Sequence, residues 1–300
     1  MFTVIVPTLN ASADWPSFAP ALLACAQPEQ VLIVDSESTD GTLELAQAAG
    51  FQVFSVKRAE FNHGGTRQMA AKMKSNAEIL IYLTQDAVLT EPSALTNLVA
   101  AFSDPQVGAA YGRQLPRPRA EAIEAHARSF NYPATSEVRS LANREQRGIK
   151  TAFLSNSLAA YRRSALMHVR GFPENVIFGE DMVTAARLLL AGYKVAYVSE
   201  ACAYHSHPYT KLQEFKRYFD IGVLHSRECW LLDEFGQAHG EGRRFVLSEL
   251  SYLWCHDIPR IPSSLVRTSI KLLGYRLGRL EASLPLNLKR RFSMHRAFWI

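Results

Sequence analysis

The strongest constraint on the fold is an alternation of short apolar runs with stretches of helical periodicity over residues 1–113. Parallel strands are buried on both faces and need a crossover helix between them, so they read as such runs. The alternation therefore predicts an α/β fold in which a mostly parallel central sheet has helices on both faces. The expected strands are Thr3–Val6, Gln30–Val34, Phe51–Val56, Glu78–Leu83 and Val107–Tyr111, and expected helices include Thr42–Ala49 and Thr66–Lys74.

Polar residues follow three of these expected strands at the point where each strand ends. The first strand leads into Pro7-Thr8-Leu9-Asn10, the second into Asp35-Ser36-Glu37-Ser38-Thr39-Asp40, and the fourth into Thr84-Gln85-Asp86. In open α/β sheets, ligands bind beyond the carboxyl ends of the strands. We therefore expect these three segments to form one binding rim.

Asp35 and Asp86 are the two carboxylates that directly follow buried strands. A carboxylate at position 35 can accept the imide N–H of a uracil or thymine ring, although Ser38, Thr39 and Asp40 beside it are also good helix N-caps. A carboxylate at position 86 can hold a hard divalent cation, which stabilises the charge on a departing diphosphate. Taken alone, Asp86 is better explained as an ordinary residue that ends a strand.

Gly179-Glu180-Asp181 precedes a helix expected over Met182–Ala191. Acidic residues at a helix N-terminus are favoured by the helix dipole whatever their function, and the dipole predicts lowered pKa values for them. The functional alternative is that one of the two is a general base, which takes a proton from an acceptor hydroxyl.

Two histidines and one arginine complete the candidate residues. His205 and His207 follow an expected strand at Lys194–Ser199. Histidines in a loop are usually surface residues. The functional alternative is that an imidazole beside Asp86 completes a mixed N/O site that Mn²⁺ accepts. Arg67 lies in a glycine-opened helix, where it is either a solvated residue or a phosphate contact.

The order of these motifs resembles the family 2 inverting glycosyltransferases of the GT-A fold. The matching segments are Val4–Asn10, Val34–Thr42, Gly65–Gln68, Gln85–Ala87 and Gly179–Asp181, so the resemblance spans roughly residues 1–210. More narrowly, Glu60–Arg67 and Leu83–Ala87 resemble the bacterial rhamnosyltransferases of cell-surface polysaccharide assembly.

This resemblance implies a role for each matched residue. Asp181 would be the catalytic base, with Glu180 as its neighbour near the acceptor. Asp86 would bind Mg²⁺ or Mn²⁺, with His205 as a further ligand. The residues expected around the donor are Pro7, Thr8, Asn10, Asp35, Ser38, Arg67 and Gln85.

One departure concerns the metal. The family's usual motif has two acids around one residue, whereas here Gln85 and Ala87 flank a single Asp86. Metal binding is therefore expected either to be weaker than usual or to be completed by His205.

The resemblance also predicts the domain organisation. Residues 1–210 would form a GT-A catalytic domain, with a nucleotide-binding half at 1–113 and an acceptor half at 114–210. Residues 211–300 would form a basic helical extension. Residues 114–150 lose regular periodicity and contain three prolines, so we expect a long, partly mobile connection there. A long helix is expected from about Lys211 to Leu232.

The positive charge of the chain is concentrated in its last part. Of the net charge of +5, Ile258–Ile300 contributes nine Lys/Arg against Glu281 alone, so the preceding residues are net acidic. An apolar stripe, Val266, Ile270, Leu273, Leu277 and Leu280, has helical spacing and is flanked by basic residues. Such a tail fits either an anionic membrane surface or packing of the stripe onto the catalytic domain.

The implied function is transfer of L-rhamnose from dTDP-L-rhamnose, with inversion, onto a polyprenyl-diphosphate-linked glycan in O-antigen biosynthesis. The protein would be cytoplasmic and peripheral at the inner face of the membrane. The alternatives are a UDP- or GDP-hexose donor and a non-catalytic sugar-nucleotide binder. A nucleotidyltransferase is disfavoured because the turn after the first strand lacks glycine and lysine, and a nucleic-acid binder because the site-bearing part is acidic.

Overall fold

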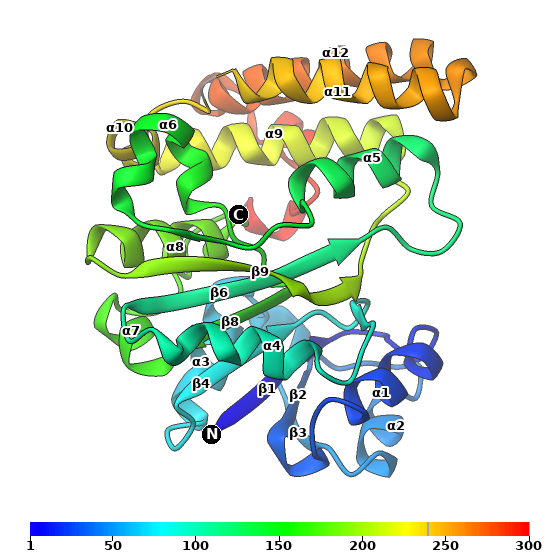
Figure 1. Cartoon of the computed structure of the whole chain (residues 1–300). Coiled ribbons are helices and arrows are strands. Elements are labelled where there is room, and N and C mark those ends of the chain that lie inside the picture. Colours follow the sequence, from blue (N-terminus) through cyan, green and yellow to red (C-terminus); the bar gives the residue numbers. More distant parts are fainter. Residues whose placement is uncertain (239, 300) are drawn as a thin grey trace.

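We describe the protein from a computed structural model that defines residues 1–238 and 240–299. Within these residues nine strands form one sheet in the order β3-β2-β1-β4-β8-β6-β9-β5, with β7 also paired to β9 (Figure 1). The strands are β1 Phe2–Thr8, β2 Val31–Asp35, β3 Gln52–Ser55, β4 Ile79–Leu83, β5 Val88–Leu89, β6 Val107–Leu115, β7 Glu137–Arg139, β8 Leu158–Arg162 and β9 Lys194–Tyr204.

The sheet is mixed rather than mostly parallel. The half formed by β3, β2, β1 and β4 is parallel, as the alternation in the sequence predicts. Strand β8 enters antiparallel between β4 and β6, and β5 and β7 both pair antiparallel with β9. The expected α/β architecture is therefore confirmed, with a smaller share of parallel pairs than we expected.

Helices cover both faces of the sheet, and successive strand residues point to opposite cores. In β1, Ile5 faces one apolar core with helices α3, α7, α8 and α9, whereas Val4 and Val6 face another with α1, α2 and α4. The helices are α1 Trp15–Leu23, α2 Thr42–Ala48, α3 His63–Met73, α4 Ala94–Ala100, α5 Ala122–Asn131, α6 Arg144–Arg147, α7 Arg163–His168, α8 Glu180–Leu190, α9 Lys211–Arg227, α10 Trp230–Phe235, α11 Glu241–His256, α12 Ile261–Arg279 and α13 Leu286–Phe292.

Residues 114–150 are not the irregular connection that we expected. They contain α5, β7 and α6, and α5 packs against α11 in the upper layer of Figure 1. Only Ile123 and His126 of α5 are buried. The ten residues are nevertheless amphipathic, so the pattern of this helix was present in the sequence and was missed.

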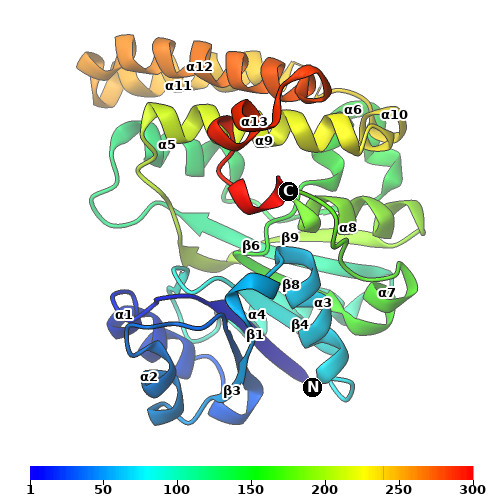
Figure 2. The ribbon, with the colours of Figure 1, turned by 180° about the vertical axis from the view of Figure 1, so that it is seen from behind.

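Residues 211–238 and 240–299 form a helical layer on one side of the sheet (Figure 1). The helix expected over Lys211–Leu232 is interrupted, because α9 ends at Arg227 and α10 begins at Trp230. Helices α11 and α12 lie outermost, over α9 (Figures 1 and 2). Phe219 of α9 and Trp299 near the C-terminus belong to the same apolar core as the sheet. A division into domains at residue 210 stays a prediction.

Helix α12 packs on α9 through small residues, and three of the five residues of its apolar stripe are exposed. A Cβ added to Gly278 would lie 2.0 Å from the carbonyl oxygen of Phe219, so the two helix backbones are in direct contact. Arg267 and Lys271 also turn inward, where both pair with the buried Glu214. The stripe is divided between the two alternatives: Val266, Leu273 and Leu280 are exposed, whereas Ile270 is half-buried and Leu277 packs against the core.

None of the helices in the described part of the chain combines the length and the hydropathy that crossing a membrane requires.

Candidate active site

The loops after β1 and β2 are tied together around Asp35. Strands β1 and β2 pair with Thr8 opposite Asp35, and the Thr8 hydroxyl donates to Asp35 Oδ1 at 3.0 Å. The Ser38 hydroxyl donates to the same oxygen at 2.6 Å, and the Ser38 N–H donates to Oδ2 at 2.9 Å. Asp35 is 2% exposed, and a carboxylate has about four lone-pair sites. One site therefore remains for a ligand N–H.

Asn10 and Gln85 stabilise the conformation of the loops after β1 and β2. Asn10 has a left-handed backbone (φ 51°), and its N–H donates to the Ser38 hydroxyl at 2.8 Å. The Gln85 side chain accepts from the Leu9 N–H at 2.7 Å and donates to the Leu9 carbonyl at 3.1 Å. Both residues therefore support the loop after Pro7, and Gln85 has its amide engaged with the protein itself.

Asp86, His205 and His207 form a cluster with metal-ligand spacing. One ligand atom from each lies within 4.8 Å of the others. His205 Nε2 is 3.5 Å from Asp86 Oδ1, and His207 Nε2 is 3.5 Å from Asp86 Oδ2. One carboxylate and two imidazoles are a donor set that first-row divalent metals accept, and Mg²⁺, which prefers oxygen, fits it less well. The second histidine, His207, adds a further donor atom beside the single acid of the sequence motif.

The surroundings of Asp86 keep its carboxylate ionised. Burial alone would raise the pKa of Asp86, but the two imidazoles, when they are protonated, hold that pKa well below its usual range, His205 by a hydrogen bond and its charge and His207 by its charge. Arg117 adds to this, because its Nη2 lies 3.7 Å from Asp86 Oδ2 and donates to the Asp86 carbonyl at 3.0 Å. Burial and then the neighbouring His205 lower the pKa of His207 to about 4, so its imidazole is neutral near pH 7.

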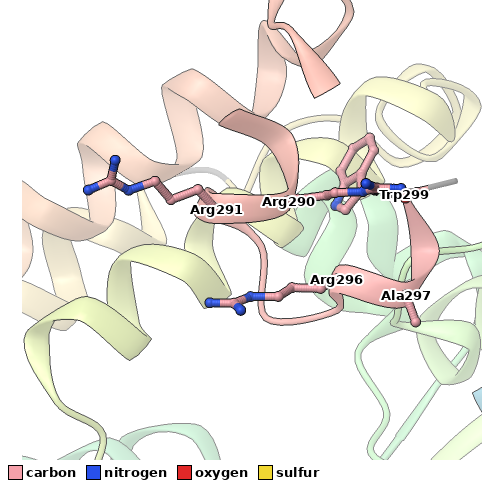
Figure 3. Close-up of a pocket in the computed structure, with 5 residues that line it drawn as sticks. All are labelled: Arg290, Arg291, Arg296, Ala297 and Trp299. Carbon is pink, nitrogen blue, oxygen red and sulfur yellow. Dashed lines mark hydrogen bonds between the residues drawn. The ribbon is translucent and has the colours of Figure 1, made fainter. Parts of the chain in front are cut away.

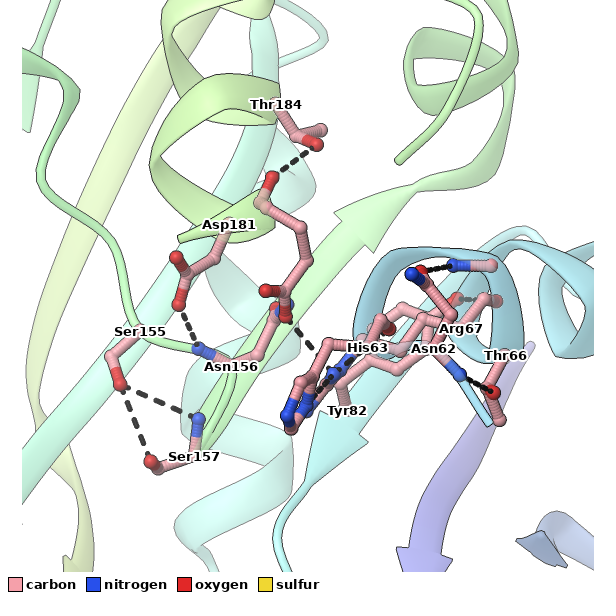
Figure 4. Close-up of polar contacts among 12 residues, drawn as sticks. Asn62, His63, Thr66, Arg67, Tyr82, Ser155, Asn156, Ser157, Asp181 and Thr184 are labelled. Carbon is pink, nitrogen blue, oxygen red and sulfur yellow. Dashed lines mark hydrogen bonds and ion pairs between the residues drawn. The ribbon is translucent and has the colours of Figure 1, made fainter. Parts of the chain in front are cut away.

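Glu180 and Asp181 begin α8 but have different surroundings (Figure 4). Glu180 is buried, and its Oε1 lies 3.0 Å from Arg67 Nη1 and accepts from Asn156 Nδ2 at 3.1 Å. Asp181 is half-buried, and its Oδ2 accepts from the Asn156 N–H at 3.1 Å. Of the two, only Asp181 retains an open side.

The pKa of Asp181 is raised to about 6, contrary to the expectation from the helix dipole. Burial is the largest cause and repulsion by Glu180 the second. Burial alone would also raise the pKa of Glu180, but the Arg67 guanidinium outweighs it and holds this pKa below its usual value. The pair thus combines a Glu180 whose anion is stabilised by Arg67 with an Asp181 that can exchange a proton near neutral pH.

Arg67 is buried beside the acid pair and is not a solvated residue. Its side chain is 6% exposed and is held between Glu180 and the carbonyl oxygen of His63, to which Nη1 donates at 3.0 Å. The Tyr82 hydroxyl, from β4, donates to the Arg67 carbonyl oxygen and so connects α3 to the sheet. This arrangement therefore gives no support for a contact between Arg67 and a nucleotide-sugar donor. The guanidinium contacts Glu180 instead.

A short turn before β8 joins the metal cluster to the acid pair. The Ser157 hydroxyl lies 3.5 Å from His205 Nε2 on one side, and the Asn156 N–H bonds Asp181 on the other. Asp86 and Asp181, far apart in the sequence, thus flank the same three-residue turn, Ser155–Ser157.

Several residues of the site were missed by reasoning from the sequence. Asn156, Gln114 and Arg117 contact the predicted residues, and none belongs to a recognisable motif. Asn156 and Gln114 are buried polar residues next to strands, but such burial shows only in the structure.

A separate cavity of about 650 Å³ lies beside the C-terminus (Figure 3). Three arginines line it together with Ala297 and Trp299, and Arg291 and Arg296 extend in the same direction from neighbouring segments. Its lining includes none of the site residues predicted from the sequence.

Comparison with known proteins gives consistent results. The family model described as glycosyl transferase family 2 matches residues 3–170. The chain is 46% identical to the O-antigen chain rhamnosyltransferase RfbN of Salmonella typhimurium, over 99% of this chain and 95% of the relative. It is 45% identical to the O-antigen chain rhamnosyltransferase WbaN of Salmonella anatum, with the same coverage. The fold is similar to that of the mannosyltransferase PcManGT of Pyrobaculum calidifontis in complex with GDP-Man and Mn²⁺, at a TM-score of 0.57, 21% identity, and coverage of 99% and 84% of the two chains.

Proposed function

The chain belongs to glycosyl transferase family 2, and we propose that it transfers L-rhamnose from dTDP-L-rhamnose, with inversion, onto a lipid-linked glycan of O-antigen biosynthesis. It is a glycosyltransferase with the GT-A fold. Near-full-length identity to two O-antigen rhamnosyltransferases supports the donor sugar and the pathway. The observation that carries the proposal is the turn Ser155–Ser157, which holds a metal-type cluster on one side and a carboxylate with raised pKa on the other.

The donor would lie along the rim after β1, β2 and β4. Asp35, stabilised by Thr8 and Ser38, would accept the imide N–H of the thymine ring. Asp86, His205 and His207 would hold a divalent metal, Mn²⁺ in preference to Mg²⁺, which would neutralise charge on the departing diphosphate. The relative with Mn²⁺ and GDP-Man bound supports this assignment.

Asp181 would be the base on the opposite side of the sugar. It takes the proton of the acceptor hydroxyl while the hydroxyl oxygen forms a bond to the anomeric carbon. The bond from that carbon to the diphosphate oxygen breaks in the same step, so the anomeric configuration inverts and no covalent nucleophile is needed. Glu180, Arg67 and Asn156 would hold Asp181 in place without contacting the substrate.

The test of this proposal compares donors directly. Purified protein is incubated with lipid-linked acceptor and with radiolabelled dTDP-L-rhamnose, UDP-glucose or GDP-mannose in parallel. We expect label in the lipid fraction only from dTDP-L-rhamnose, in a linkage of the opposite anomeric configuration to the donor. Preferential transfer from a UDP- or GDP-hexose would identify that nucleotide sugar as the donor in place of dTDP-L-rhamnose. Binding of a nucleotide sugar without transfer would favour a non-catalytic sugar-nucleotide binder.

The same proposal includes a peripheral position on the cytoplasmic face of a membrane. The support is an exposed apolar surface on the outermost helices, at least 47% exposed at every residue. The seven-residue spacings within it place its members on one side of each helix. This outer apolar face consists of Leu247 and Trp254 of α11, Ile258 in the turn before α12, Leu265, Val266, Leu272 and Leu273 of α12, and Leu280 after it.

Charge favours lipid over a second copy of the chain as the partner of this face. Arg276 and Arg279 are exposed at the end of α12, and in the described part of the chain Arg276 has no acidic partner within 4.0 Å. Self-association would bury such arginines at a large desolvation cost, whereas anionic headgroups would pair with them. Exposed Trp254 beside Ile258 is also typical of a membrane–water interface.

A further inference from the structure

Gln114, at the end of β6, contacts the metal cluster from behind. It is 2% exposed, and its side chain has three polar neighbours. Its Oε1 lies 2.6 Å from Arg128 Nη1 and 3.0 Å from His205 Nδ1, and its Nε2 donates to the Ser155 hydroxyl at 2.9 Å. The amide thus connects α5, the histidine of the cluster and the turn that leads to Asp181.

Arg128 determines which way this amide points. A guanidinium has donors only, so the amide atom 2.6 Å from Arg128 Nη1 must be the oxygen. Turning the amide over would place an NH₂ group against that guanidinium. The orientation of the Gln114 amide therefore follows from contact with a charged group.

The protonation pattern of His205 follows in turn. The Gln114 oxygen can only accept, so the Nδ1 of His205 that faces it must carry the hydrogen. In a neutral imidazole the other nitrogen, Nε2, then has a free lone pair. This nitrogen faces Asp86 Oδ1 at 3.5 Å, which brings two electron-rich atoms together at the place where a cation would lie.

We propose that Gln114 is a positioning residue of the transferase, which, held by Arg128, fixes His205 in the Nδ1–H tautomer and so directs Nε2 to the metal. This inference rests on the metal site of the proposed function, but the tautomer itself exists without metal. Hydrogen-bond partners of a ligating histidine orient the ring and raise its basicity, and their loss typically weakens metal binding ten- to a hundred-fold.

The tautomer can be read directly in metal-free protein. Long-range ¹H–¹⁵N correlation spectra at pH 8 distinguish Nδ1–H from Nε2–H histidines, and a His205→Gln variant identifies the signal of His205. We expect Nδ1–H in the wild type, the same in Gln114→Glu, which keeps an acceptor oxygen, and Nε2–H in Gln114→Leu. The exposed Gln106, changed to Leu, is the matched control and should behave as the wild type.

Mn²⁺ affinity, measured by electron paramagnetic resonance of free Mn²⁺, provides the second readout. We expect a ten- to a hundred-fold loss in Gln114→Leu and less than a threefold change in Gln114→Glu and Gln106→Leu. An Nε2–H signal in the wild type, or an unchanged tautomer and affinity in a folded Gln114→Leu, would overturn the inference. An Nδ1–H signal in a protein that binds no Mn²⁺ would uphold the tautomer and instead refute the proposed metal site.

Discussion

Arg67 Nη1 lies 3.0 Å from Glu180 Oε1, and both side chains are less than 8% exposed. Glu180 is the direct neighbour of Asp181, so this buried ion pair lies next to the proposed base. The pKa values of the two adjacent acids are shifted in opposite directions. Glu180 is held as an anion by Arg67, and its charge raises the pKa of Asp181.

Replacing Arg67 by Met should strongly destabilise the protein. Glu180 would remain buried without a compensating charge, and breaking such a pair costs about 3–5 kcal/mol. The free energy of unfolding in urea measures this. The control is Arg58→Met in the exposed segment before α3, which should change stability by less than about 0.5 kcal/mol. Equal stability of the two variants would mean that the pair is not formed in solution.

Transfer activity should fall as the pH falls through about 6, because protonated Asp181 cannot accept a proton. In Glu180→Gln, repulsion on Asp181 disappears, so its pKa should fall and the acidic limb of the kcat profile should move to lower pH. The measurement is kcat against pH from 4.5 to 8.5 for both proteins. An acidic limb that stays in place, or moves upward, would contradict the proposed coupling between the two acids.

Asp181→Asn should lower kcat by about 10²–10⁴-fold while the protein becomes more stable near neutral pH. Because the pKa of Asp181 is raised in the folded state, its ionisation destabilises that state as the pH rises from about 4 to about 6 and above. The gain in Tm should therefore be largest near pH 8 and vanish as the pH approaches the unfolded pKa. A variant that loses both activity and Tm at pH 8 would instead indicate a structural role.

Exhaustive chelation should abolish transfer, and Mn²⁺ should restore it better than Mg²⁺ because two of the three donors are imidazoles. His207→Ala should raise the Mn²⁺ concentration needed for half-maximal activity at least tenfold, whereas Ala at the exposed His256 should not. Full activity after chelation would show that transfer does not require a metal ion.

Gly278→Ala should detach or distort α12, because the added methyl would lie 2.0 Å from the Phe219 carbonyl oxygen. The same change at Gly242 of α11 meets nothing within 4 Å and should stabilise that helix by up to about 1 kcal/mol. Thermal unfolding of both variants tests the contact between α9 and α12. A Gly278→Ala variant as stable as the wild type would show that the two backbones do not approach this closely.

The outer apolar face should bind anionic vesicles. We expect flotation of the wild type with phosphatidylglycerol liposomes, loss of flotation in Trp254→Ser/Leu272→Ser, and full flotation when the exposed Leu45 and Leu190 on other helices are changed to Ser. Equal flotation of both double variants would refute membrane binding by this face. Light scattering that reports a dimer disrupted by the first pair would assign the face to self-association.

The alternation of the first 113 residues determined the parallel half of the sheet and the position of Asp35 and Asp86 at its rim. Those features depend on local periodicity and on the rule that ligands lie beyond the strand ends, both of which are visible in the sequence. The metal motif with one acid could also be recognised as incomplete. The sequence offered His205 to complete it, and the distance of His205 to Asp86 supports that expectation. His207, at the same distance, was not among the expected ligands.

The tertiary structure decided which partner each polar group has. Arg67 pairs with Glu180, and Gln114 contacts His205. Two glycines bring one side of α12 against α9, while Val266, Leu273 and Leu280 are exposed. Each contact joins residues distant in the chain, and no spacing in the sequence encodes such a pair. The raised pKa of Asp181 has the same origin, because it depends on how deeply the folded chain buries the carboxylate beside Glu180.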